Sequence, residues 1–204
     1  MSEVQIPAAL VKELREQTGA GMMDCKGALQ ENDGDLEKAA EYLRKQGIAK
    51  ADKKAGRAAN EGLVHAYIHQ GGKIGVLLEV NCETDFVANT DDFKSFCHEV
   101  AMQIAATSPQ YLNRDDVDPG LLAKEKEIYR EAALNEGKPE NVIDRIVEGK
   151  VEKYYEQVCL LEQPWIRDGD KTIEELMKET IAKLGENLGI ARFTRFALGE
   201  GSEG

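Results

Sequence analysis

The chain has 204 residues, of which 42% are hydrophobic and 31% are charged. This length suits one ordinary domain plus a small one, and the composition excludes disordered, collagen-like and fibrous proteins. The formal net charge of −12 argues against broad nucleic-acid binding, because such binding needs a basic surface. We therefore expect no direct contact with nucleic acid.

The sequence shows neither a targeting segment nor a membrane segment. Its N-terminus has no apolar stretch of signal-peptide length, and no run of about 18 apolar residues occurs. The cysteines are scattered without paired spacing, which is typical of reduced thiols rather than of disulfides or a zinc site. These features predict a cytoplasmic protein with no membrane association. The cysteines are Cys25, Cys82, Cys97 and Cys159.

Residues 1–46 have the pattern of a small three-helix bundle. Pro7 stands at a helix start, and the glycines at Gly19 and Gly21 predict the end of that first helix. After a second short helix, the Asn-Asp-Gly-Asp stretch at residues 32–35 predicts a turn. Apolar residues then recur at i, i+3, i+4 and i+7, which predicts a third helix. They are Leu36, Ala39, Ala40 and Leu43.

A locally basic segment follows, and we assign residues 47–61 to a linker. Residues 48–57 carry four positive charges against one acid. Two interpretations stay open: a solvated linker helix, or a basic contact with an acidic partner.

Strand patterns begin at residue 62. Residues 62–69 and 74–82 are rich in β-branched and aromatic side chains, and Gln-Gly-Gly-Lys between them is a hairpin signal. A third strand is predicted at residues 190–198. In the second strand, alternate apolar residues share one face while Leu77 points to the other. Apolar residues on both faces favour helices covering one face and a second copy of the chain covering the other.

Helix signals fill the interval between the second and third strands. Thr90 opens one helix, and Asp118 followed by Pro119 opens another. A longer helix follows Pro139, and so short a connection predicts an antiparallel helical hairpin at about residues 119–163.

A capping box between Thr172 and Glu175 opens the last helix. Strands and helices do not alternate as in a parallel sheet, so the predicted fold class is α+β. It combines the helical bundle with a three-stranded antiparallel sheet, packed with helices, from which the hairpin projects. This core domain spans residues 62–200, and residues 201–204 form a flexible tail.

No motif in the chain predicts catalysis, a metal or a cofactor. The Gly-Ala-Gly stretch at residues 19–21 lacks the third glycine and the preceding strand of a dinucleotide loop, and no P-loop occurs. His65 and His69 lie about 13 Å apart along a strand, too far to share a metal. We predict that the protein is not an enzyme and holds no cofactor.

The segment at residues 81–89 is unusual because it places Phe86 and Val87 beside Asp85 between a strand and a helix. The aromatic ring can act as a hydrophobic staple for the following helix. Alternatively, it is a wedge presented to a partner. The residue pattern alone leaves both interpretations open.

Two stretches of this chain resemble signatures of the elongation factor Ts family. Residues 84–89, Thr-Asp-Phe-Val-Ala-Asn, resemble its TDFVA signature, and residues 10–26 resemble its N-terminal signature. The resemblance extends over essentially the whole chain. It implies a guanine-nucleotide exchange factor that binds elongation factor Tu in its GDP form during translation elongation.

The resemblance also implies roles for individual residues. Residues 1–46 are similar to a ubiquitin-associated domain that docks on the G domain of elongation factor Tu. By position, Met22 and Met23 are its candidate contacts, although either methionine could instead fill the bundle core. A generic binding module would explain this bundle but not the loop at residues 84–89.

In the family, the aspartate-phenylalanine pair enters the partner near its magnesium site. Phe86 would then be the wedge and Asp85 its polar partner, while Thr84 and Val87 shape the loop. Insertion would disturb Mg²⁺ and the phosphates, and GDP would leave faster. The chain departs from longer members of the family because it has one sheet plus the hairpin. Short members are similar to it and dimerise through the sheet, which implies a homodimer.

Overall fold

The computed structural model describes residues 6–200, so the predicted flexible tail at residues 201–204 lies outside the described residues. The chain divides into two compact units. The first comprises residues 1–63, 80–96 and 177–189, and the second comprises residues 64–79, 97–176 and 190–204. This division does not test the predicted domain boundaries after residues 46 and 61, which stay predictions. No helix within residues 6–200 is long and apolar enough to cross a membrane.

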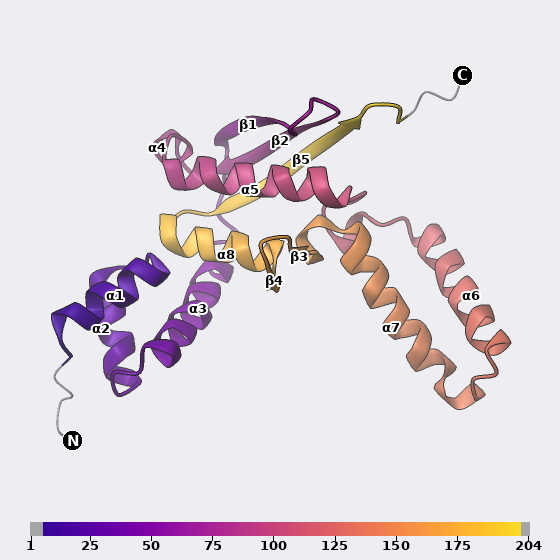
Figure 1. Cartoon of the computed structure of the whole chain (residues 1–204), viewed down its shortest axis with the longest axis horizontal. Helices are drawn as coiled ribbons and strands as arrows, with labels where there is room; N and C mark the ends of the chain where they lie inside the picture. The colour runs from indigo at the N-terminus through magenta and orange to yellow at the C-terminus, as the bar shows by residue number, and fades with distance from the viewer. Residues whose placement is uncertain (1–5, 201–204) are drawn as a thin grey trace. The chain divides into compact units, whose positions relative to one another are not determined.

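The N-terminal bundle consists of α1 (Ala8–Thr18), α2 (Met22–Glu31) and α3 (Leu36–Asp52), drawn in indigo and purple in Figure 1. The first helix ends where Gly19 adopts a left-handed conformation with φ of 67°, which glycine does without a steric penalty. Helix α3 begins at Asp35, whose side chain accepts a hydrogen bond from the Lys38 N–H. The buried centre contains Val11, Leu14, Cys25, Ala28, Leu29 and Ala39.

Helix α3 extends into the basic segment that was assigned to a linker. It ends at Asp52, and turns follow at residues 53–56. A Cβ atom at Gly47 would lie 3.1 Å from the Cβ of Ala182, so only a small residue fits where α3 meets α8 (Ile173–Leu184). The first part of the basic segment is therefore helical.

The three-stranded antiparallel sheet has the order β1-β2-β5, with β1 at Glu61–Ile68, β2 at Ile74–Cys82 and β5 at Leu188–Ala197. The tight turn between β1 and β2 closes with a 2.9 Å hydrogen bond from the His69 N–H to the Ile74 carbonyl. Side chains in β2 alternate as predicted: Val76 and Leu78 are buried while Leu77 is exposed. The predicted α+β class is confirmed.

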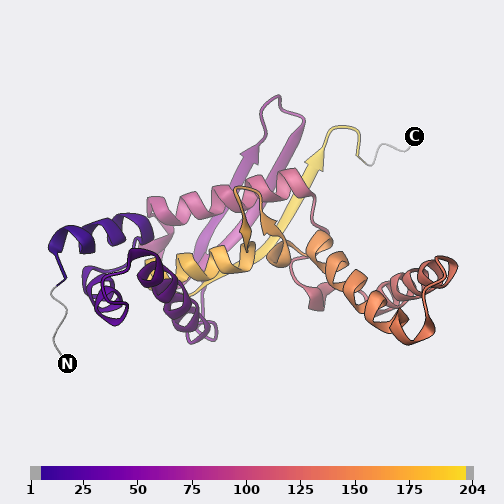
Figure 2. The ribbon, with the colours of Figure 1, turned by 60° about the horizontal axis from the view of Figure 1, so that its bottom comes forward.

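The helices predicted after β2 are present, and a short helix that was not predicted precedes them. After α4 (Asp85–Ala88) come α5 (Asp91–Thr107), α6 (Pro119–Asn135) and α7 (Glu140–Val158). Helices α6 and α7 lie side by side in Figures 1 and 2. Their contact buries Ala133, Ile143, Val147 and Val151.

Two predicted caps have the expected geometry. The Asp118 side chain accepts from the Leu121 N–H at 2.8 Å, at the start of α6. In the box that opens α8, Thr172 and Glu175 each accept the other's backbone N–H at 3.2 Å. The sequence interpretation missed the small sheet formed by β3 (Pro164–Trp165) and β4 (Asp168–Thr172), because strands of two and five residues carry almost no periodic signal.

Candidate functional site

The segment after β2, which the sequence analysis described as a loop, contains one helical turn, α4. Thr84 is its N-cap: the hydroxyl accepts a hydrogen bond from the Val87 N–H at 3.4 Å. Asn89 closes the turn, because both its backbone N–H and its side-chain amide donate to the Asp85 carbonyl. The residues of the predicted signature therefore form a short, capped helix.

Phe86 is 82% exposed on this turn. A hydrophobic staple requires the ring to pack against the following helix, so this exposure argues against that interpretation. Asp85 beside it is exposed, Val87 is half-buried, and Ala88 is buried. The turn thus presents an aromatic ring and a carboxylate together while its aliphatic side packs inward.

Beneath the turn, Cys82 and Thr84 connect it to the end of β2. The Cys82 thiol is fully buried and lies 3.1 Å from the Thr84 carbonyl oxygen, to which it donates. Burial raises the pKa of the Cys82 thiol, and the nearby Glu186 carboxylate adds to this rise. Cys82 is therefore a protonated packing residue rather than a reactive thiolate.

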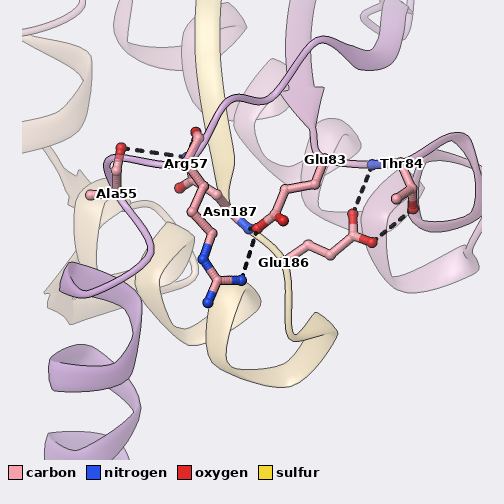
Figure 3. A network of polar contacts seen from close by, with 6 residues as sticks. All are labelled: Ala55, Arg57, Glu83, Thr84, Glu186 and Asn187. Atoms are coloured by element: carbon pink, nitrogen blue, oxygen red, sulfur yellow. Dashed lines mark hydrogen bonds and ion pairs between the residues drawn. The ribbon is translucent and has the colours of Figure 1, made fainter.

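The sequence analysis missed two residues of this site, Glu186 and Asn187, which lie between α8 and the start of β5 (Figure 3). The Glu186 carboxylate accepts from the Thr84 N–H at 3.0 Å and from the Thr84 hydroxyl at 2.7 Å. These residues are 102 positions apart in the chain. No local pattern could have indicated the contact, because only the fold brings the two segments together.

Asn187 connects the same loop to the segment after α3. Its backbone N–H donates to the Glu83 carboxylate at 2.7 Å. Its side-chain amide donates to the Arg57 carbonyl at 2.8 Å and lies 3.5 Å from the Ala55 carbonyl, as Figure 3 shows. The Arg57 guanidinium lies 3.5 Å from Glu83. One buried asparagine therefore holds two segments that are distant in sequence.

The two methionines of the N-terminal bundle are both exposed, Met22 by 45% and Met23 by 78%. Neither fills the bundle core, so that alternative is wrong. Cys25, Ala28 and Leu29 take the core positions one to two turns further along α2. Met22 and Met23 are thus two exposed apolar side chains in the first turn of that helix.

The first unit also contains a charged cleft of about 440 Å³. Two ion pairs lie along it, Lys12 with Glu16 at 3.7 Å and Lys183 with Asp92 at 2.7 Å. Within residues 6–200, no three histidine, cysteine or acidic side chains are arranged to hold a metal ion. The features that stand out chemically are therefore the exposed apolar side chains and the polar network behind them.

Residues 47–200 match the model of the family described as "Elongation factor TS". The chain is 66% identical over 198 residues to "Elongation factor Ts" of Thermoanaerobacter pseudethanolicus, with 97% of each chain covered. It is 62% identical over 196 residues to the protein of that name from Moorella thermoacetica, covering 96% of this chain and 97% of the other. For the same-named protein of Geobacter sulfurreducens, the identity is 58% over 200 residues, covering 98% and 93%.

Proposed function

Because the chain belongs to the elongation factor Ts family, we propose that it is a guanine-nucleotide exchange factor that binds elongation factor Tu and promotes GDP release. The observation that supports this most directly is the exposed Phe86 on a capped helical turn. A large apolar ring gains free energy only when a partner covers it, so its exposure favours a docking role. Exchange breaks no covalent bond and therefore needs no catalytic side chain.

The proposed mechanism uses Phe86 as a wedge close to the nucleotide. Mg²⁺ bridges nucleotide phosphates and requires near-ideal octahedral geometry, so a small displacement of its ligands weakens the site. Insertion of the ring would displace the partner groups that hold the ion, and Asp85 would contact polar groups beside it. Thr84 and Val87 shape the turn from within. GDP then loses part of its electrostatic anchor.

The N-terminal bundle supplies a second proposed contact. Met22 and Met23 would dock on the G domain of elongation factor Tu, because methionine adapts its flexible, polarisable side chain to an apolar surface. Their exposure supports this assignment. Docking at two separated places would hold the wedge against the partner.

Thermodynamic linkage defines what the factor must do. It must bind nucleotide-free elongation factor Tu more tightly than the GDP form, and GDP must weaken the factor's binding by the same ratio. Each tenfold ratio corresponds to about 1.4 kcal/mol of coupling free energy.

The test is the release of fluorescent GDP from purified elongation factor Tu in excess unlabelled GDP. We expect the wild-type chain to accelerate release strongly, and Phe86→Ala to lose at least about tenfold of that acceleration, or ~1.4 kcal/mol. Ile166→Ala, which shortens another exposed apolar side chain outside this site, is the matched control and should behave as wild type.

The possible outcomes separate function from mechanism. Acceleration that survives Phe86→Ala would keep the function but place the mechanism in the bundle or the helical hairpin. Absence of acceleration by the wild type, with a competent elongation factor Tu, would contradict the function and favour a binding module.

We also propose that two copies of the chain associate through the sheet. Support comes from exposed apolar side chains on the strands, on the face opposite the buried Val76 and Leu78. A second copy could cover this face, as the resemblance to short family members implies. The exposed residues are Val64, Ile68, Leu77 and Phe196.

A further inference from the structure

The turn that carries Phe86 is too short to hold its own conformation. Helix α4 has four residues, whereas isolated helices shorter than about 12 residues are marginal in water. The ring is 82% exposed, so little packing orients it. Its direction must therefore be set by the backbone of the turn and by whatever fixes that backbone.

Thr84 is the point at which the backbone of the turn is fixed. Its hydroxyl group can donate one hydrogen bond and accept two. The proton goes to the Glu186 carboxylate at 2.7 Å, which leaves the lone pairs free to cap the Val87 N–H. The Thr84 N–H donates to the other Glu186 oxygen at 3.0 Å. Glu186 thus holds both the backbone and the side-chain rotamer of the N-cap.

A carboxylate suits this position because both groups that face it are donors. An ionised carboxylate only accepts hydrogen bonds, and bonds to a charged acceptor are stronger than neutral ones. Glu186 is itself well placed, because Gly185, which follows the last residue of α8, turns the chain in a left-handed conformation with φ of 81°. On its other side, Asn187 is buried and bonded to Glu83 and Arg57.

We propose that Glu186 is a positioning residue for nucleotide exchange, which orients the Phe86 turn by anchoring its N-cap Thr84. This inference rests on the proposed function. Loss of Glu186 should leave the Phe86 ring exposed but without a fixed orientation. Binding through the N-terminal bundle would persist, while the step that expels GDP would slow.

The experiment measures GDP release from elongation factor Tu over a range of factor concentrations. For Glu186→Ala, the maximal release rate should fall about tenfold, while the half-saturating concentration changes by less than about threefold. Thr84→Val should give a similar fall. The double variant should lose less than the two single losses combined, because both changes remove the bond between the Thr84 hydroxyl and Glu186.

Glu186→Gln provides a nearly isosteric second variant. It keeps one acceptor oxygen but replaces the other with an amide that cannot accept, so it should lose an intermediate fraction of the maximal rate. Thermal melts by circular dichroism establish that each variant is folded at the assay temperature. If Glu186→Ala does not fold, Glu186→Gln decides the question by its rate alone.

Wild type and Phe86→Ala are measured in the same series, so the two proposals can fail separately. If the wild type gives no acceleration, the proposed function is wrong. If Phe86→Ala is slow but folded Glu186→Gln and Glu186→Ala match the wild type, the positioning role is wrong. Additive losses in the double variant would also overturn it, because Glu186 would then act independently of Thr84.

Discussion

At the scale of single residues, the exposed apolar residues and the buried polar residues obey opposite constraints. Phe86 and Met23 remain in water, although burial of such a side chain would contribute about 1.5–3 kcal/mol. Asn187 is withdrawn from water and has its hydrogen bonds satisfied. Exposed apolar residues of this kind are candidates for binding, whereas satisfied buried polar residues hold segments in place.

His65 on β1 combines partial burial with an unsatisfied atom. Its Nε2 is buried and finds no hydrogen-bond partner among the described residues. The His98 ring lies edge-on to the His65 ring, with 5.6 Å between the ring centroids. The Tyr67 ring is also edge-on to His98, with 5.3 Å between their centroids. Burial lowers the pKa of His65 below its usual value near 6.5, and the neighbouring His98 contributes in the same direction.

We predict that His65 contributes to acid sensitivity. A lowered pKa in the fold means that the unfolded chain binds the proton more readily, so this contribution is present above about pH 6.5 and is lost as the pH falls below it. The melting temperature of His65→Asn should therefore fall less between pH 7.5 and pH 5.5 than that of the wild type. Proton NMR of the imidazole should give a His65 midpoint below 6.5, and a midpoint at or above 6.5 would contradict the assignment.

At the scale of elements, local signals located most helix ends and missed one close approach between strands. The caps at Asp118 and Thr172 depend on residues three positions apart and could be predicted from the sequence. The need for glycine at Gly62 in β1 could not be predicted from its sequence neighbours, because it depends on Val80 in the next strand. The φ of Gly62 is 142°, and a Cβ atom there would lie 2.1 Å from the Val80 carbonyl oxygen.

Gly62→Ala should therefore destabilise the β1–β2 pairing. The backbone conformation alone is unfavourable for alanine by about 1–3 kcal/mol, and the contact with Val80 adds to this because backbone cannot move aside easily. Gly71→Ala is the matched control: its φ of 95° is also positive, but no atom lies within 4 Å of the added Cβ. Urea unfolding should show a larger loss for Gly62→Ala, and equal losses would show that the close approach is unimportant.

At the scale of the whole molecule, the question is whether the exposed sheet face is covered in solution. Leu77 and Phe196 lie on neighbouring strands, β2 and β5, and both are exposed. Large apolar side chains exposed on neighbouring strands of one sheet favour an interface.

We predict that Phe196→Glu weakens self-association at least about tenfold in dissociation constant, because it places a charge in a desolvated contact. Ile128→Glu on α6 changes an equally apolar exposed residue away from the sheet and should leave association unchanged. Sedimentation equilibrium measures both. A wild-type chain that stays monomeric at micromolar concentration, or an Ile128→Glu variant as weak as Phe196→Glu, would contradict the sheet interface.

The sequence by itself determined the features that depend on neighbours along the chain. Helical periodicity, the Asp118 cap, the capping box at Thr172, the hairpin turn and the signature at residues 84–89 all lie within a few residues of their causes. They were sufficient to predict the α+β class and to show the resemblance to the elongation factor Ts family. The comparisons with known proteins confirmed the family.

Only the tertiary structure decided which side chains remain exposed and which distant segments meet. From the sequence, Phe86 could be either a hydrophobic staple or an exposed wedge, and Met22 and Met23 could be either buried or exposed. These alternatives stayed open because burial depends on packing partners far along the chain. The same reason hid Glu186 and Asn187, which reach the Phe86 turn across 102 and 104 positions. Hydrogen bonds over such separations form only after the chain has folded, so no local pattern records them.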